Sequence, residues 1–466
     1  MHATLPHRHC FGISVASQHE TGRGWPVLSC GAVLRSAEHP GSISLAGTGD
    51  NQEQSKRPSL ILMIGPGLLL AATGVGGGDL ATGTFVGGLL GTAVLWAVLV
   101  GAFLKFVVTE GLARWQLATG ETLVEGAMHR LGPAAVWLFL PYLLLWSFFV
   151  GSAQMSACGV ALHAMFPVFE DAAVGKIVFG IVSGTVGVAL VMRGGYRLFE
   201  RVMRVCIAVM FLTVIVTAAL LWPGTTEVMQ GLLIPSIPQI DGEGLTWTVA
   251  LIGGVGGTLT VLCYGYWLRE EGLTKPEHLR VCRIDLGTGY LMTAAFGVSM
   301  VIVGSNVQVQ GGGAELLVDL SFTLEELLGP VGKWLFLIGT FGAVFSSLFG
   351  VWQSVPYLFA DCWQLVSGRG ATGNAQTVDT QSAPYRVYLV LIALIPMIGL
   401  FWSFREVQKL YTVTGALFFP VLALALLIFN GRSAWVGARF RNRPLTVLSL
   451  LGVLGFFSWV GFLSLR

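Results

Sequence analysis

The sequence predicts an all-α polytopic membrane protein, from its composition and from the arrangement of its apolar residues. Of 466 residues, 54% are hydrophobic and only 11% are charged, whereas a soluble domain carries roughly 25% charged residues. The apolar residues form long runs instead of alternating with polar ones. Long runs exclude a membrane β-barrel and favour helices that cross the membrane.

Eleven apolar segments are predicted to be the membrane spans, since a helix needs about 20 apolar residues to cross a bilayer. Polar or charged residues separate these segments and belong at the membrane surface. The segments lie at about 59–87, 90–110, 133–165, 174–192, 198–222, 246–268, 281–303, 331–360, 385–403, 408–430 and 444–465.

Basic residues give these spans an orientation, because Lys and Arg concentrate in loops on the cytoplasmic side. Of the 27 Lys and Arg residues, Lys105 lies within the second span, five lie in segments expected outside, and the other 21 lie in segments expected inside. An error of one span would scramble this distribution. We therefore expect a protein of the inner (plasma) membrane, surrounded by the lipid bilayer, with its N-terminus in the cytoplasm and its C-terminus outside.

Several other classes of protein and partner are excluded. Residues 1–57 are polar and lack an apolar stretch of signal-peptide length, so we interpret them as a disordered cytoplasmic tail or an overextended start. The seven cysteines form no CxxC pair, which argues against a disulfide framework or a zinc site. The net charge of +2 is near neutral and aromatic residues lie inside apolar runs, so nucleic acid is not an expected partner. No cofactor is expected.

Glycine strings interrupt the first and sixth spans. Thr73-Gly-Val-Gly-Gly-Gly-Asp79 should unwind the first span, since glycine costs roughly 1 kcal/mol per helical position relative to alanine. Gly253-Gly-Val-Gly-Gly257 repeats part of this string. Paired breaks in two inverted five-span halves are typical of a transporter's substrate site, although glycines also simply let helices approach closely. The halves are predicted at 58–222 and 246–430, forming a ten-helix core over 58–430, with an eleventh helix in 431–466.

Asp79 is the residue most expected to bind a substrate. An ionisable side chain inside an apolar span is costly and marks a functional site by default, and Asp79 follows three glycines whose carbonyl groups should be free. A carboxylate with carbonyl oxygens suits a hard metal ion such as Mg²⁺ or Mn²⁺, or a monovalent ion. The predicted metal site therefore contains Asp79, Gly76 and Gly77. Alternatively, or in addition, Asp79 caps the following half-helix as its N-cap residue.

Other polar residues within the spans are further candidates. Cys263 and Tyr264 of the sixth span are predicted to face the first break, with interfacial anchoring as the alternative for the tyrosine. Gln154 of the third span and Gln353 of the eighth would line a polar cavity or bridge helices. No His pair or Ser–His couple in a sensible context lies within the spans, so an intramembrane enzyme is not expected.

Asp285 and Asp361 are predicted to take part in an inner gate at the cytoplasmic ends of the seventh and eighth spans. The arginines between Arg193 and Arg204 lie at helical spacing where the fifth span begins, and the two aspartates could pair with them. The alternative is that these arginines form a solvated face in contact with lipid headgroups.

Gly65-Pro66-Gly67-Leu68-Leu69, followed by Ala71-Ala72 and Leu80-Ala81-Thr82, resembles the first span of the Nramp (natural resistance-associated macrophage protein) family of proton-coupled divalent-metal transporters. The likeness covers most of residues 58–465. This resemblance implies the leucine-transporter-like 5+5 inverted-repeat fold with an eleventh helix. It also implies transport of a metal cation by alternating access.

The sequence departs from the family at its metal-binding motifs. The family's Asp-Pro-Gly-Asn motif aligns with Gly76 to Asp79, which moves the carboxylate by three positions. Val261-Leu262-Cys263 stands at about the place of the family's Met-Pro-His, so the soft thioether ligand is lost. Gly151 and Gln154 stand where the family has an Asp and a Glu tied to proton movement. The resemblance therefore implies a harder ion and weak or absent proton coupling.

The predicted function is a secondary-type transporter that moves a metal cation such as Mg²⁺ or Mn²⁺ by alternating access. A transporter of a small organic substrate on the same fold is one alternative, in which a half-helix N-terminus would bind a carboxylate. The negative charge of Asp79 argues against an anionic group at that point. A non-transporting sensor is the other alternative, because the usual ligands are replaced.

Overall fold

The computed structural model describes residues 65–464 of the chain, apart from 241, 255, 307–315 and 369–377. Every regular element in this part of the chain is helical, as the long apolar runs predict. The tail predicted at 1–57 lies outside the described residues.

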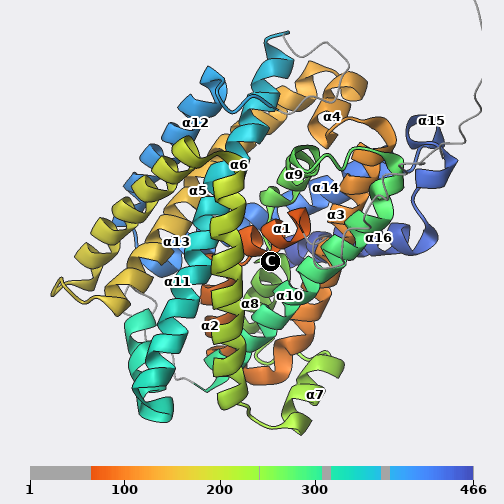
Figure 1. The fold of residues 1–466 in the computed structure, drawn as a ribbon. Helices are drawn as coiled ribbons and strands as arrows, with labels where there is room; N and C mark the ends of the chain where they lie inside the picture. Colours follow the sequence, from red (N-terminus) through yellow and green to blue (C-terminus); the bar gives the residue numbers. More distant parts are fainter. Residues whose placement is uncertain (1–64, 241, 255, 307–315, 369–377, 465–466) are drawn as a thin grey trace, which may run out of the picture. The chain divides into compact units, whose positions relative to one another are not determined.

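The described helices form one bundle, in which α1, α2 and α8 lie between the longer helices (Figure 1). In chain order the elements are α1 (Pro66–Gly74), α2 (Gly77–Leu90), η2 (Gly91–Val94), α3 (Leu95–Thr119), α4 (Leu123–Leu131), α5 (Pro133–Met165), α6 (Ala172–Leu220), α7 (Thr225–Leu233), α8 (Glu243–Gly254), η3 (Leu259–Cys263), α9 (Tyr264–Glu270), η4 (Pro276–His278), α10 (Leu279–Ser305), α11 (Leu316–Val366), α12 (Ala383–Leu394), η5 (Ile395–Phe401), α13 (Phe404–Ala416), α14 (Phe418–Phe429), α15 (Ser433–Val436), η6 (Ala438–Phe440) and α16 (Pro444–Ser464).

Within the described residues, the predicted spans fall on helices. By length and composition, eight helical stretches there are able to cross a membrane, and a shorter apolar helix covers Pro444–Trp459. One of the eight holds two predicted spans, and another holds one span with the end of the span before it. Asp79–Thr119 runs from the first span into the second, and Ala172–Leu220 joins the fourth to the fifth across a kink at Gly195. Gly195 has a φ of 58°, which glycine adopts without strain, so the chain reverses there between two spans.

Glycines permit close crossings between these helices. A Cβ atom at Gly304 of α10 would lie 2.5 Å from the Thr84 carbonyl oxygen of α2, and one at Gly87 of α2 would overlap the Val301 carbonyl oxygen of α10. Lipid chains are as apolar as the helices, so helices in membranes associate through such close packing of small residues. Part of the high glycine content therefore serves packing and not the breaks.

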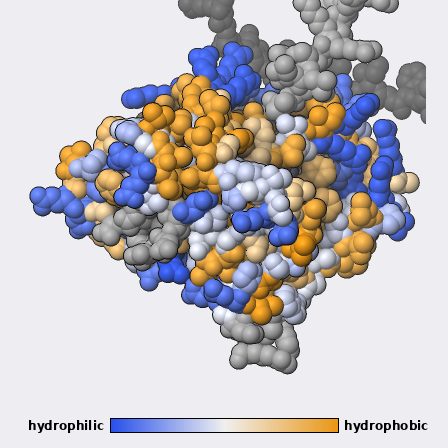
Figure 2. Space-filling model, turned by 90° about the horizontal axis from the view of Figure 1, so that it is seen from below, coloured by the Kyte–Doolittle hydropathy of each residue, from blue (hydrophilic) through white to orange (hydrophobic). Residues whose placement is uncertain are grey.

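The two ends of the bundle differ from its sides. α4 and α15 lie at one end and α7 lies at the other (Figure 1). Viewed from the end where α7 lies, hydrophilic and hydrophobic residues are interspersed over the surface (Figure 2). Large apolar side chains such as Leu138 of α5 and Leu291 of α10 are exposed on the helices between the ends. Exposed leucines on helix faces suit contact with lipid chains.

Candidate functional site

The glycine breaks of the first and sixth spans meet inside the bundle. α1 ends at Gly74 and α2 begins at Gly77, while α8 ends at Gly254. A Cβ atom at Gly74 would lie 2.5 Å from the carbonyl carbon of Gly256, so the two backbones touch. Gly256 and Gly257 have φ values of 79° and 82°, a region that favours glycine. The glycines therefore break both spans and also let the breaks approach each other closely.

Asp79 is buried in the first turn of α2. Its Oδ2 accepts a hydrogen bond of 3.3 Å from the backbone N–H of Gly76, the residue before the helix. Asp79 therefore caps α2 from the third helical position and is not the N-cap residue, which corrects that interpretation. Its Oδ1 accepts a hydrogen bond of 3.1 Å from the N–H of Gly256. One carboxylate thus joins the two breaks.

Gln154 of α5 closes another side of the first break. Its Oε1 accepts a hydrogen bond of 3.1 Å from the N–H of Gly77, and its Nε2 donates to Ser347 Oγ of α11 at 2.8 Å. Ser347 donates in turn to the carbonyl oxygen of Thr73 at 2.7 Å. The structure therefore brings Gln154 together with the predicted Gly76 and Gly77. The amides of both glycines are already bonded to protein oxygens, so a carboxylate substrate would have to displace those oxygens.

A buried lysine fills the second break. Lys105 of α3 is 1% exposed, and its Nζ donates to the carbonyl oxygens of Gly253 at 2.9 Å, of Gly254 at 3.3 Å and of Gly257. These three oxygens, called the carbonyl cage below, use all three N–H donors of the ammonium group. Nζ also lies 4.7 Å from the centre of the Phe419 ring, within the range of a cation–π contact. The cage therefore holds a primary ammonium ion.

Asp79 and Lys105 bring an acidic and a basic group into one buried site, where the attraction between them opposes the cost of burial. Moving an ion from water into a protein interior costs several kcal/mol unless an opposite charge and hydrogen bonds compensate. Here backbone amides satisfy the carboxylate and backbone carbonyls satisfy the ammonium. The site as it stands has no net charge.

Two buried oxygens near the breaks have no hydrogen-bond partner among the described residues: Oε1 of Gln408 in α13 and Oγ1 of Thr260 in η3. A Cβ atom at Gly77 would lie 3.0 Å from Gln408 Nε2, and one at Gly257 would lie 2.6 Å from Thr260 Oγ1. Leaving a buried acceptor unpaired costs about 1–3 kcal/mol. With the carboxylate of Asp79, these oxygens could bind a hard cation. Among the described residues, no three His, Cys, Asp or Glu side chains lie together in a way that could hold a metal ion.

Tyr264 and Asp285 lie together at the start of α1, and not at the break where α1 ends. The Tyr264 hydroxyl donates to Asp285 Oδ2 at 2.9 Å. The carboxylate also accepts hydrogen bonds from the N–H groups of Gly65, at 3.1 Å, and Gly67, at 2.6 Å. The prediction that Tyr264 faces the first break is therefore corrected. Asp285 holds the first turn of α1 in place by satisfying amides that lack a helical partner.

Asp361 and Gln353 of α11 contact residues in and around α9. Asp361 Oδ2 accepts from the Tyr266 hydroxyl at 2.6 Å and from Thr122 Oγ1 at 3.2 Å. Gln353 Oε1 accepts from the Trp267 indole N–H at 2.8 Å. Gln353 therefore bridges helices, which was one of its two interpretations, and it does not line the break.

The predicted pairing of the two gate aspartates with the arginines of α6 is not found in the described part of the chain. Asp285 and Asp361 bind amides and hydroxyl groups instead, and Arg204 pairs with Glu200. α9 is also bound to α4, through hydrogen bonds of 3.0 and 2.6 Å between Arg269 and Glu125. Tyrosines, aspartates and this ion pair thus join α9 to α4, α10 and α11.

Sequence reasoning did not single out Lys105, Gln408 or Thr260, and it misjudged Cys263 as well as Tyr264. Lys105 stood out only as a basic residue inside an apolar span, a signal that marks a functional site in its own right. Gln408 lies just after the polar start of α13 and gave no such signal. Cys263, predicted to supply a thiol, is buried at the end of η3, and no contact between it and Asp79 is found among the described residues.

Comparison with known proteins agrees with this architecture. A model of the natural resistance-associated macrophage protein-like family, Nramp, matches residues 67–465. The divalent metal cation transporter MntH of Acidiphilium cryptum is 25% identical over 414 residues, which cover 84% of this chain and 87% of that protein. MntH of Bacillus subtilis is 26% identical over 306 residues, 62% of this chain and 68% of that protein.

Solved structures agree on the fold. A crystal structure of a manganese transporter from Eremococcus coleocola matches with a TM-score of 0.69 and 17% identity, and the match covers 88% of each chain. MhsT in complex with L-phenylalanine matches with a TM-score of 0.57 and 14% identity, over 83% of this chain and 95% of that one. The predicted leucine-transporter-like inverted-repeat fold is confirmed. Because the family model covers most of the sequence, this multi-pass membrane protein belongs to the Nramp family.

Proposed function

We propose that the chain carries a metal cation through the membrane by alternating access, with its substrate site at the crossing of the two glycine breaks. One observation carries this proposal. The carbonyl cage already binds a cation, the ammonium group of Lys105, beside the carboxylate of Asp79. The same oxygens are available to another cation when the ammonium leaves. The relatives named divalent metal cation transporters support a metal as that cation.

The available ligands favour a hard ion, and we infer Mg²⁺ or Mn²⁺. Asp79 supplies a carboxylate, the carbonyl cage supplies backbone oxygens, and Gln408 and Thr260 have unpaired oxygens. Both ions accept oxygen ligands, whereas thiolate and thioether ligands select softer metals. The thiol of Cys263 has no part in this set.

Lys105 has to leave the carbonyl cage when the metal enters, because the same three oxygens do not bind two cations at once. The ammonium is attached through a flexible four-carbon chain, so it can withdraw while α3 stays in place. A resident ammonium competes with the metal and lowers its apparent affinity. Replacing Lys105 by an uncharged residue should therefore tighten metal binding.

The proposed movement is a change in the angle between half-helices at the two breaks, as in other inverted-repeat transporters. Opening toward the cytoplasm would require α9 to separate from α4, α10 and α11, and so to break the Tyr266–Asp361 and Arg269–Glu125 contacts. The excess of basic residues in the loops around α4, α9 and α15 supports a cytoplasmic location for this end. Proton coupling should be weak or absent, because Gly151 and Gln154 do not titrate.

A small organic substrate with a primary ammonium group is a second candidate. The carbonyl cage is fitted to an ammonium ion, since Lys105 Nζ makes three hydrogen bonds in it. The ammonium group of a free amine could replace that of Lys105, because it offers the same three N–H donors to the carbonyl cage. A carboxylate substrate has less support, because the amides of Gly76 and Gly77 bind Asp79 and Gln154.

Uptake into proteoliposomes tests these proposals. Flux of Mg²⁺, Mn²⁺, Ca²⁺, Na⁺ and methylammonium would be measured for the wild type, Asp79→Asn and Lys105→Met. The matched control is Glu326→Gln, which removes an exposed carboxylate. We expect Mg²⁺ or Mn²⁺ uptake by the wild type and the control, none by Asp79→Asn, and a lower half-saturating concentration for Lys105→Met. Equal flux in wild type and Asp79→Asn for every ion would contradict the site.

The same vesicles distinguish the remaining candidates. A pH indicator inside them should report little acidification during metal uptake, and strong metal-driven acidification would contradict weak proton coupling. Uptake of methylammonium without metal uptake would favour the organic substrate. If neither the wild type nor Lys105→Met takes up any ion, and thermal unfolding shows that both proteins are folded, the result would favour a non-transporting sensor.

A further inference from the structure

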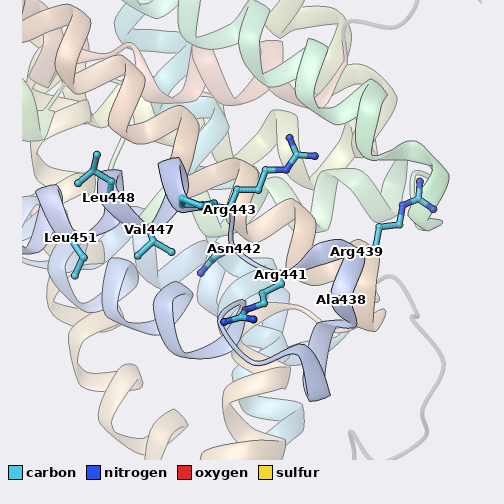
Figure 3. A pocket seen from close by; sticks show the side chains of 9 residues that line it. Ala438, Arg439, Arg441, Asn442, Arg443, Val447, Leu448 and Leu451 are labelled. Carbon is cyan, nitrogen blue, oxygen red and sulfur yellow. The ribbon is translucent and has the colours of Figure 1, made fainter.

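A basic pocket lies where α16 begins, apart from the glycine breaks. It has a volume of about 730 Å³ and is lined at one side by Arg439, Arg441 and Arg443 and at the other by Val447, Leu448 and Leu451 (Figure 3). A smaller hollow of about 200 Å³ shares Arg439 and Arg443 with it. The pocket thus combines a cationic side with an apolar side.

Buried hydrogen bonds hold the loop that carries these arginines. Arg114 of α3 is 3% exposed and donates to the carbonyl oxygens of Phe440, at 3.3 Å, and Arg441, at 3.1 Å. It also donates to Asn442 Oδ1 at 2.9 Å, and the Asn442 side chain donates to the Leu426 carbonyl at 3.0 Å. The pocket wall is therefore fixed by α3 and α14 and does not depend on the exposed side chains.

The arginines of the pocket form no ion pair among the described residues, although Glu277 lines the smaller hollow together with Arg439 and Arg443. Arg439, Arg441 and Arg443 are all exposed. The neighbouring Arg283 differs, because it pairs with Glu110 of α3 at 2.7 Å. Guanidinium groups bind phosphate through paired, charge-assisted hydrogen bonds. Three unpaired guanidinium groups around one pocket therefore favour a phosphate-bearing ligand.

The apolar side identifies the source of that phosphate. Leu448 and Leu451 are 68% and 51% exposed on α16, whose stretch Pro444–Trp459 is apolar, and exposed leucines on such a helix suit contact with lipid chains. α16 begins at Pro444, one residue after Arg443, so the arginines lie at the level where a span leaves the apolar layer. A free phosphate would contact only the arginines, whereas a phospholipid also covers the leucines.

We propose that this pocket binds one anionic phospholipid, with its phosphate and headgroup at Arg439, Arg441 and Arg443 and an acyl chain along Val447, Leu448 and Leu451. Basic pockets at the cytoplasmic boundary of membrane helices are suited to anionic headgroups. The bound lipid would join the loop before α16 to α3, through the hydrogen bonds of Arg114.

Native mass spectrometry of the full chain, released from detergent with added lipid, tests the proposal. Phosphatidylglycerol should bind to the wild type, and Arg441→Gln/Arg443→Gln should weaken its binding about tenfold. The matched control is Arg386→Gln/Lys409→Gln, which removes two exposed charges from α12 and α13, away from the pocket, and should leave binding unchanged. Equal weakening by the two double variants would overturn the pocket as the site.

Two further measurements test whether the pocket binds a whole anionic phospholipid or only its phosphate group. Phosphatidylcholine should bind more weakly than phosphatidylglycerol, and free glycerol phosphate at the same concentration should not displace the lipid. Leu448→Gln/Leu451→Gln changes only exposed side chains, so it should fold, and it should weaken phosphatidylglycerol binding with every arginine in place. Unchanged binding in this variant, or displacement by glycerol phosphate, would overturn the lipid proposal.

Discussion

The two glycine breaks share the string Gly-Val-Gly-Gly but present opposite chemistry to the site. At the first break, the start of α2 exposes N–H groups, which bind oxygens of Asp79 and Gln154. At the second, the end of α8 exposes carbonyl oxygens, which bind the ammonium group of Lys105. Helix starts lack acceptors for their amides and helix ends lack donors for their carbonyls. A repeated sequence therefore gives two complementary halves of one site.

The charges that complete each half come from different places. Asp79 directly follows the first string, whereas the second string is not followed by an Asp, Glu, Lys, Arg or His residue before Arg269. Its counterpart, Lys105, belongs to α3, outside both breaks. We therefore expect the contributions of the two charges to stability to depend on each other. We also expect the first break to be stabilised mainly by side-chain contacts and the second mainly by its backbone conformation.

Removal of one charge should have the largest effect on stability. Asp79→Ala leaves the Lys105 ammonium buried without its counter-ion, and loss of one partner from a buried ion pair costs about 3–5 kcal/mol. The temperature at which the variant unfolds in detergent should therefore lie well below that of the wild type. Asp79→Ala/Lys105→Met should regain most of the loss. Simple additivity of the two single changes would contradict the dependence of one break on the other.

Backbone conformation should matter more at the second break than at the first. Gly257→Ala forces a side chain to a φ of 82°, which costs about 1–2 kcal/mol, and crowds Thr260 Oγ1. Gly76 has a φ of −145°, which any residue adopts, so Gly76→Ala disturbs only side chains, those of Ser347 and Gln154. We expect Gly76→Ala to be rescued by Ser347→Gly. The unfolding temperatures of Gly257→Ala, Gly76→Ala and Gly76→Ala/Ser347→Gly would test this expectation. Equal losses of stability in the two single alanine variants would contradict the proposed difference between the breaks.

The side-chain contacts of the first break should contribute less. Gln154→Ala leaves the amide of Gly77 without its acceptor and removes the hydrogen bond that Ser347 Oγ accepts. A polar contact inside a membrane bundle contributes up to about 1.7 kcal/mol. We expect a loss of about 1.5 kcal/mol in the same unfolding measurement. Thr185→Ala, on an exposed face of α6, is the control and should change little. A loss no larger than that of the control would mean that Gln154 does not hold the break.

Tyr264→Phe should have the smallest effect on stability. It tests whether a contact at the start of α1 affects the substrate site at the end of α1. The change removes one hydrogen bond to Asp285, which keeps its bonds to Gly65 and Gly67. The average intramembrane hydrogen bond contributes about 0.6 kcal/mol, so we expect a slight loss of stability. The half-saturating concentration for metal uptake should not change. A large change in that concentration would restore Tyr264 to the substrate site.

The fold could be predicted from the sequence because length, hydropathy and glycine strings carry it. The apolar segments fall on the helices, and both strings interrupt their spans. Asp79 was predicted at the first break because it follows the glycine string. Gln154 was predicted to line a polar cavity or to bridge helices, and it joins the first break to α11. Tyr264 was misplaced because η3 turns the chain after the second break, and a periodic pattern does not give the rotation of a helix beyond such an interruption.

The role of Lys105 could not be read from its neighbours in sequence. Its partners in the carbonyl cage are backbone oxygens, and a carbonyl group looks the same at every residue. Contact between α3 and the second break depends on the packing of helices far apart in the chain, which periodicity does not supply. The inner gate was misjudged for a similar reason, because Asp285 binds amides of α1 that have no side-chain signature.

The neutral pairing of Asp79 with Lys105 bears on how a transmembrane voltage would act on the proposed carrier. Moving one elementary charge through 100 mV corresponds to about 2.3 kcal/mol. A site holding only the carboxylate would carry negative charge through the field on each empty return. With the ammonium beside it, the empty site returns without net charge. Voltage would then act only on the step in which the metal-bound site moves through the membrane. The membrane potential would favour inward movement of the metal without slowing the return of the empty site.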